Sequence, residues 1–421
     1  MSSRAPVDWK DFEILGEQMK KIAKLSLVAA VAVAGLTTAN AQPLEEAIKN
    51  VDVSGSVVYR YNDIQDDAAK ASKDGVNNNY KVGLNLSSKV NEDVKFNSRF
   101  LVANPFAADG NFANDNGSSA LDTSSSDTNV DTQLSHANFA YTGLKNTTVT
   151  VGKQGLATPY TTPTMIDENE QNGTGIMALS TVGPVTLGAA YFNQTNLNAI
   201  SDSALKVDGK ATNASIFDGG EDIAAVAAIA TFAPVTIDAW YLDLQDTFDT
   251  YTLGAKSDFD IAGVKLGADA RYASLDLDKK DVDNNIAKLI LTAKAGIVNA
   301  KVAYAMTDKE GGLTGLDSDA ITVLKGWNLN TLNKADADYW QAVAGVDILS
   351  NLNLSANYGN LQYVASAKDI EEEEVYGQLT YKMSKNLSTY VRYGTYTKET
   401  EKATGKDIDA TAGRLQVAYT F

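Results

Sequence analysis

The sequence predicts an all-β fold, an 18-stranded antiparallel transmembrane β-barrel with short periplasmic turns and long extracellular loops. Three observations predict it. Apolar and polar residues alternate along almost the whole chain after residue 42, short turns alternate with long polar loops, and the last alternating run ends on Phe421. Successive side chains of a strand point to opposite faces, so this alternation indicates strands with one apolar and one polar face.

The N-terminal region has the composition of a secretory signal peptide. Within residues 19–41, a basic start (MKKIAK) precedes an apolar stretch at 25–35, and the small residues Ala-Asn-Ala occupy 39–41. This order is typical of a cleaved export signal, and the apolar stretch is too short to span a membrane. We therefore expect a single barrel domain over 42–421. Residues 1–18 have no place in a signal and are interpreted as a mis-assigned upstream extension.

The mature chain contains 18 alternating runs. In the first, Val53, Val57 and Tyr59 share one face, and Ser56 and Arg60 share the other. Each run is near the roughly 9–11 residues that a tilted strand needs to cross a bilayer. The runs lie at about 51–61, 80–86, 94–102, 134–143, 147–153, 174–182, 185–194, 222–232, 235–245, 250–259, 263–275, 286–297, 299–307, 338–348, 351–364, 372–383, 386–397 and 410–421.

The connections between the runs also alternate. Short turns such as 183–184 and 233–234 are followed by longer polar loops. The long loops lie at about 63–77, 104–132, 154–173, 195–221 and 308–337, and shorter ones at 246–249, 276–285, 365–371 and 398–409. A bilayer offers no water to unpaired backbone groups, so a sheet that crosses it must close on itself. A secreted all-β adhesin is the main alternative to a membrane barrel.

Composition excludes several classes of protein. The 421 residues include no Cys and one His, which argues against thiol catalysis, cysteine zinc sites and histidine-based active sites, and no enzyme is expected. The net charge of −17 argues against nucleic acid as a partner, because phosphate binding needs clustered Lys and Arg. No apolar run after residue 42 approaches the roughly 18 residues of a transmembrane helix.

Three blocks of sequence resemble the Campylobacter-type major outer membrane porin family of epsilonproteobacteria. They are residues 43–55 (PLEEAIKNVDVSG), residues 151–154 (VGKQ) with the Gly-Thr-Gly at 173–175, and the closing 414–421 (RLQVAYTF). The resemblance extends over essentially all of 19–421. It implies a homotrimeric general diffusion porin of the bacterial outer membrane, surrounded by lipid and lipopolysaccharide, that passes small hydrophilic solutes and ions with a mild preference for cations.

The third long loop, 154–173, is the candidate constriction, because in porins this loop folds into the lumen. It carries Asp167, Glu168 and Glu170. Facing it, we expect a set of basic residues on the lumenal wall, namely Arg60, Lys81, Lys95, Arg99 and Lys153. An acidic loop opposite a basic wall creates a transverse field that favours small polar solutes over apolar ones.

The resemblance also implies a calcium ion near the constriction, held by acidic oxygens from different loops, which suits the oxygen-rich and flexible coordination of calcium. Asp167 matches the third-loop acid of the family. Asp202 in the fourth loop and Asp317 or Asp319 in the seventh are weaker matches. Two other functions stay open: a substrate-specific channel of the same architecture, and a barrel that acts mainly as an adhesin or structural protein.

Overall fold

The computed structural model describes residues 50–67, 75–102, 132–167, 170–197, 206–207, 210–211, 220–278, 282–401 and 407–421. The proposed signal peptide and the 1–18 extension lie outside these residues, and both stay predictions. Among the residues described, no helix is long and apolar enough to cross a membrane.

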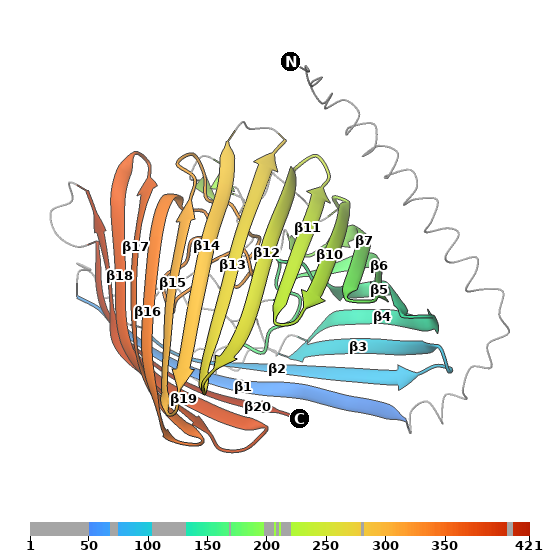
Figure 1. Cartoon of the computed structure of the whole chain (residues 1–421), viewed down its shortest axis with the longest axis horizontal. Coiled ribbons are helices and arrows are strands. Elements are labelled where there is room, and N and C mark those ends of the chain that lie inside the picture. Colours follow the sequence, from blue (N-terminus) through green and yellow to red (C-terminus); the bar gives the residue numbers. More distant parts are fainter. Residues whose placement is uncertain are drawn as a thin grey trace, which may run out of the picture.

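Eighteen antiparallel strands form one closed sheet, which confirms the predicted fold class and strand number (Figure 1). The barrel strands are β1 Val51–Asp66, β2 Gly75–Lys89, β3 Val94–Val102, β4 Thr132–Leu144, β5 Thr147–Gly155, β6 Asn172–Val182, β7 Val185–Thr195, β10 Ile223–Phe232, β11 Val235–Leu244, β12 Phe248–Ile261, β13 Val264–Leu277, β14 Asp283–Ala295, β15 Val298–Thr307, β16 Ala335–Leu349, β17 Leu352–Ala365, β18 Lys368–Lys382, β19 Leu387–Thr400 and β20 Ile408–Thr420. Between β7 and β10, β8 (Lys206–Val207) and β9 (Lys210–Ala211) pair only with each other.

The two ends of the sheet meet at β1 and β20, which pair over eleven residues. Phe421 extends this seam, because its backbone N–H and C=O exchange hydrogen bonds with Gly55 at 3.0 and 2.9 Å. The Phe421 ring also lies over Gly55, where an added Cβ would come within 2.8 Å of it. The terminal aromatic residue therefore closes the barrel through both its backbone and its ring.

Short turns and long loops alternate as predicted, with one exception. Residues 365–371 were expected to form a loop, but β17 and β18 are joined by a two-residue turn at Ser366–Ala367. Both turn residues have positive φ, 53° and 57°. The acidic run at 371–374 consequently lies inside β18, where its residues alternate between the two faces.

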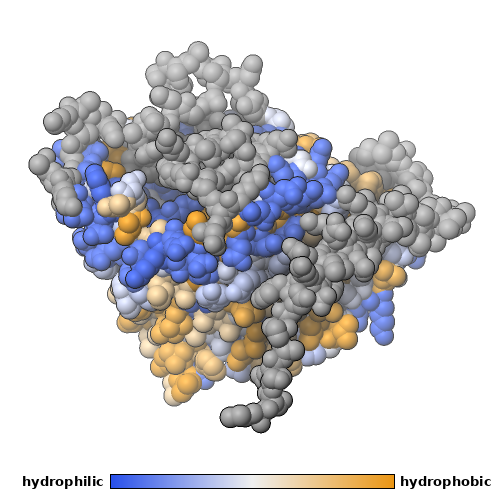
Figure 2. Space-filling model, turned by 90° about the horizontal axis from the view of Figure 1, so that it is seen from above, coloured by the Kyte–Doolittle hydropathy of each residue, from blue (hydrophilic) through white to orange (hydrophobic). Residues whose placement is uncertain are grey.

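The outward face of the barrel is apolar. Large hydrophobic side chains such as Val53, Leu253 and Tyr393 are between 55 and 65% exposed. Figure 2 shows apolar residues gathered in a band next to a polar one. A water-soluble surface rarely carries so much contiguous apolar area, whereas a bilayer covers it. Aromatic residues near the strand ends include the stacked Tyr419 and Phe421, with ring centroids 5.7 Å apart.

The interior of the barrel contains an apolar core that the alternation did not predict. The connection between β5 and β6 (156–171, the third loop) and the connection between β15 and β16 (308–334, the seventh loop) bring buried side chains inside. Tyr160 and Leu316, both at most 1% exposed, belong to the same buried cluster as Leu361 of the wall. The two loops therefore fill part of the lumen together.

Candidate functional site: the lumenal constriction

The third loop is anchored to the inner wall through Glu170. Its carboxylate accepts hydrogen bonds from Arg99 of β3, with Nη2 at 2.6 Å from Oε1 and Nε at 2.9 Å from Oε2. Lys81 of β2 lies 3.0 Å from Oε1, and Ser135 of β4 donates to Oε2 at 2.9 Å. All four side chains are buried. One loop carboxylate thus connects three adjacent strands.

A second anchor lies one strand further around the wall. Asp167 forms an ion pair with Arg60 of β1 at 2.8 Å, and the same carboxylate oxygen accepts a hydrogen bond from Gln416 of β20 at 3.1 Å. Arg60 in turn donates from Nε to the Gln416 side-chain oxygen at 2.8 Å. Lys81 adds a hydrogen bond to the backbone oxygen of Met165 at 2.7 Å. The third loop is therefore fixed across β1 to β4 and β20.

The electrostatics of the Glu170 anchor favour the charged carboxylate. Burial alone would raise the pKa of Glu170, but the hydrogen bonds from Arg99 and the charge of Lys81 outweigh it and hold the pKa below its usual range. Buried charges are stable only when they are paired and hydrogen-bonded. Glu170 therefore remains ionised and neutralises part of the basic wall.

These contacts change the predicted picture of an acidic loop facing a basic wall across water. Arg60, Lys81 and Arg99 touch the loop acids directly, and each of the three is at most 4% exposed. From their charges, the sequence indicated that the third-loop acids and these three basic residues face each other. It did not show that the partners would pair, because pairing depends on how deeply the loop folds in.

Two of the predicted wall residues, Lys153 and Lys95, do not lie beside the third loop. The register pairs Lys153 with Ala137 on the face that carries the exposed Val151 and Phe139, so Lys153 is on the outside and its Nζ donates to the Leu134 carbonyl at 2.7 Å. Its predicted lumenal position is wrong, because the two-residue period of β5 decides the face and a charged end can reach back to the backbone.

Lys95 does lie on the lumenal face, on which the register aligns it with Lys89 beside the short turn at 90–93. It precedes Arg99 by four residues, which is roughly 13 Å along a strand. Lys95 therefore lines the periplasmic end rather than the level of the third loop. Glu168, the remaining predicted constriction acid, lies outside the described residues.

The seventh loop is a second constricting element that sequence reasoning missed. Its Leu316 N–H donates to the Tyr160 carbonyl of the third loop at 2.7 Å, and Thr322 N–H donates to Pro159 at 3.1 Å. On the wall, Lys288 of β14 donates to the carbonyls of Ile321 and Val323. The available signal was its run of apolar residues between 313 and 332, which is unusual for a loop exposed to water.

Glu372 and Glu374 of β18 hold the tip and the end of the seventh loop. Glu374, which is 2% exposed, accepts hydrogen bonds from the backbone N–H groups of Trp327 at 3.0 Å and Asn328 at 2.7 Å. Glu372 lies 3.6 Å from Lys334 in an ion pair. Their alternating positions in the acidic run place both of them inward.

Three of the four acids proposed for calcium are described, and each of them has another partner. Asp167 pairs with Arg60, Asp319 pairs with Lys325, and the Asp317 carboxylate accepts the Asp319 backbone N–H at 2.8 Å. Asp202 lies outside the described residues. In the part of the chain that is described, no three acidic or histidine side chains are close enough to hold a metal ion. These residues alone do not fit a calcium site.

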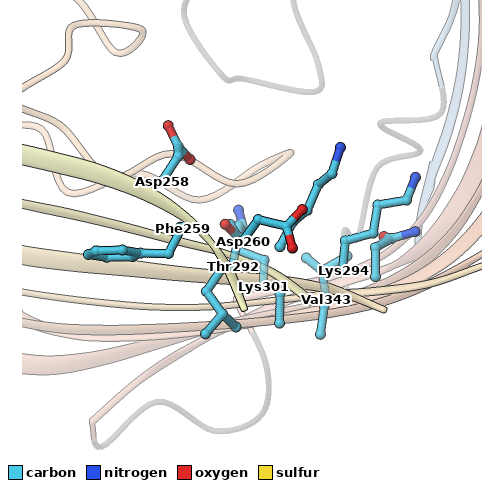
Figure 3. A pocket seen from close by; sticks show the side chains of 13 residues that line it. Asp258, Phe259, Asp260, Thr292, Lys294, Lys301 and Val343 are labelled. Atoms are coloured by element: carbon cyan, nitrogen blue, oxygen red, sulfur yellow. The ribbon is translucent and has the colours of Figure 1, made fainter. Parts of the chain in front are cut away.

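The periplasmic half of the lumen has its own charged wall. A recess of about 590 Å³ lies against β12 to β16 near the short turns, and its lining includes Lys265, Lys294 and Lys301 together with Asp258 and Asp260. Figure 3 shows Asp258 and Phe259 extending to opposite sides of β12. Lysines of neighbouring strands lie level there, since Lys265 pairs in register with Lys294.

A closed 18-stranded barrel with an apolar outer face and a charged lumen narrowed by inserted loops defines the class of outer-membrane β-barrel channels. The chain belongs to the Campylobacter major outer membrane protein family, whose model matches residues 19–421. This confirms the family indicated by the three blocks of sequence and places the protein in the outer membrane as a channel.

Solved structures of bacterial proteins share the fold at low sequence identity. OccK2 (OpdF) of Pseudomonas aeruginosa, solved in complex with glucuronate, has a TM-score of 0.67 at 13% identity over 88% of this chain and 98% of its own. OpdL of Pseudomonas aeruginosa has a TM-score of 0.65 at 18% identity over 89% and 99%. OccAB3 of Acinetobacter baumannii has a TM-score of 0.63 at 16% identity over 88% and 99%. No curated protein sequence matches the chain.

Proposed function

We propose that the protein is a general diffusion porin, constricted by its third loop, that passes small hydrophilic solutes and ions with a weak preference for cations. The observation that carries the proposal is the anchoring of the third loop inside the barrel by Glu170 and Asp167. A loop fixed against the inner wall narrows the lumen at a constant position, and the narrowest charged ring decides which solutes pass.

The weak cation preference is supported by acidic charge at the long-loop rim of the barrel. At the long-loop rim, on the outer face that also carries Glu373, a recess of about 350 Å³ is lined by the five acids Asp336, Asp369, Glu371, Glu399 and Glu401. Acidic charge at the rim raises the local concentration of cations near the pore entrance. The lysines of the periplasmic recess act in the opposite direction, so the net preference should be small.

We further propose a homotrimer surrounded by lipid and lipopolysaccharide, as the family resemblance implies. The exposed apolar side chains of the outer wall, such as Val302 and Leu354, need a cover of acyl chains or of a neighbouring subunit. Three barrels in one particle would give conductance steps that arrive in groups of three.

A substrate-specific channel is the second candidate. It is favoured by the seventh loop, which fills the lumen with a second, well-anchored segment. Two inserted loops leave a passage with a more defined shape than one loop does, and shape together with placed charges gives selectivity among solutes.

Planar-bilayer recording tests these proposals. We expect stepwise ohmic currents in groups of three. In a potassium chloride gradient, we expect a small reversal potential with the sign of a cation-selective pore. An insulating protein would contradict the porin function and favour an adhesin or structural role. Ohmic steps with saturation by one solute would favour the substrate-specific channel.

A further inference from the structure

A cluster of two arginines and three aromatic residues lines the lumen beside the third loop. We call this set the arginine–aromatic cluster, and its members are Arg392 of β19, Arg414 of β20, Trp327 of the seventh loop, Tyr376 of β18 and Tyr390 of β19. Arg392 and Arg414 are direct cross-strand partners. Like charges that face each other on adjacent strands destabilise a sheet unless another group compensates them.

Aromatic rings supply part of that compensation. The Arg392 guanidinium carbon lies 5.0 Å from the Trp327 ring centroid, 4.9 Å from that of Tyr376 and 5.0 Å from that of Tyr390. Arg414 lies 5.7 Å from the same Trp327 ring. Trp327 is itself held in position, because Glu374 accepts its backbone N–H and its ring meets Tyr376 edge-on at 5.2 Å.

The Arg392 guanidinium is oriented on one side only. Its Nε donates to the Gln378 side-chain oxygen at 2.8 Å. No described residue accepts a hydrogen bond from its two Nη atoms, and no described carboxylate forms an ion pair with it. A guanidinium held at Nε, with no described acceptor at its two Nη atoms, matches the two oxygens of a carboxylate.

The cluster lies next to the constriction. Gln416 follows Arg414 by two residues on the same lumenal face, and it contacts Asp167 of the third loop at 3.1 Å and the Tyr390 hydroxyl at 3.0 Å. Gln416 therefore connects the third loop directly to the arginine–aromatic cluster.

From this geometry we infer that the arginine–aromatic cluster is a binding station for small organic carboxylates that carry a flat ring. The carboxylate of the solute binds the Nη groups of Arg392, and the ring of the solute stacks on the aromatic faces of the cluster. The two contacts together hold both ends of the solute. This inference rests on the proposed function, because it names a class of solute for the same lumen. It places a carboxylate station inside a pore that prefers cations overall.

Single-channel recording with sodium benzoate tests the station. In the wild type, benzoate should reduce or interrupt the current in a saturable manner, and acetate, which lacks the ring, should need about tenfold more for the same effect. Arg392→Gln should weaken the benzoate effect by about tenfold or more, since a charged hydrogen-bonded contact is lost. Arg392→Lys should retain part of it, because the charge remains without the planar fork.

Lys265→Gln is the matched control, because it removes a lumenal cation from the periplasmic recess and leaves the cluster intact. Its benzoate response should equal that of the wild type. Equal benzoate block in wild type and Arg392→Gln would overturn the inference while leaving the porin function standing.

A protein that carries no current would contradict the porin function and leave the station to an independent measurement. In that case, binding is measured as the quenching of tryptophan fluorescence by benzoate in detergent. The quenching in the wild type is compared with that in the Trp327→Phe variant. Quenching that is unchanged in Trp327→Phe and Arg392→Gln would overturn the station by this second route.

Discussion

Glu170 and Arg99 form a two-point ion pair inside the barrel, with the Nη2 atom 2.6 Å from Oε1 and the Nε atom 2.9 Å from Oε2. The two side chains are 1% and 4% exposed, so water screens the pair very little. Two parallel hydrogen bonds also fix the relative orientation of the loop and the wall. This pair makes the third loop part of the wall.

Replacing Glu170 by Gln should release the third loop. The change removes the carboxylate that pairs with the buried Arg99 and Lys81, which costs about 3–5 kcal/mol for a pair of this kind. We expect a lower unfolding temperature in detergent and noisier channel currents, measured by temperature-dependent gel mobility and by bilayer recording. Asp258→Asn removes a lumenal acid of the periplasmic recess and should leave both readouts close to wild type. Unchanged stability of Glu170→Gln would argue against the anchor.

The contact between the two loops should depend on Leu316. This side chain is 1% exposed and lies in the buried cluster with Tyr160, so Leu316→Ala should destabilise the loop packing by about 2–5 kcal/mol. Ile321 in the same loop is 52% exposed, and Ile321→Ala should have little effect. Protease sensitivity of the folded protein and channel noise measure the difference. Equal behaviour of the two variants would show that the seventh loop does not depend on this core.

Asp317 should make stability depend on pH. Burial raises the pKa of its carboxyl from 3.8 to about 6, so the folded protein binds this proton more tightly than the unfolded chain does. Its contribution to stability is therefore fully present below about pH 4 and is lost as pH rises through about 6, with an upper limit of about 3 kcal/mol.

Asp317→Asn should remove this part of the pH dependence, which thermal unfolding between pH 4.5 and 7 would measure for both proteins. Glu170 has the opposite pH dependence, because its pKa is held below the usual range and its contribution to stability is lost as pH falls. Parallel pH profiles for wild type and variant would contradict the assignment to Asp317.

Asp167→Asn should move ion selectivity toward anions. The change removes the carboxylate that forms an ion pair with Arg60 at 2.8 Å and so makes the charge beside the third loop more positive. The reversal potential in a salt gradient measures the shift. Glu373→Gln makes the same change in total charge on the outer face, where Glu373 contacts Tyr358, and should not alter selectivity. A shift of the reversal potential of the same size in both variants would indicate an effect of total charge and would contradict a specific role of Asp167.

The strands were predictable because a membrane barrel repeats one local rule. Val53, Val57 and Tyr59 face outward in β1, and Arg60 faces inward, as the two-residue period requires. The rule failed where a residue was assigned to a face by its charge, as for Lys153. It also placed the start of β18 at 372 rather than at Lys368, because the consecutive charges at 371–374 hide the alternation.

The sequence by itself determined the barrel, its strand number, its family and the third-loop acids that contact the wall, because all of these depend on local periodicity, spacing and motif. Only the tertiary structure decided that Glu170 pairs with Arg99 in direct contact, that the seventh loop enters the lumen, and that Arg392 and Arg414 meet around Trp327. The Glu170–Arg99 contact and the contacts of Arg392 and Arg414 with Trp327 join residues more than 60 positions apart in the chain. Their geometry follows from barrel closure and from how deeply two loops fold, which no local pattern encodes.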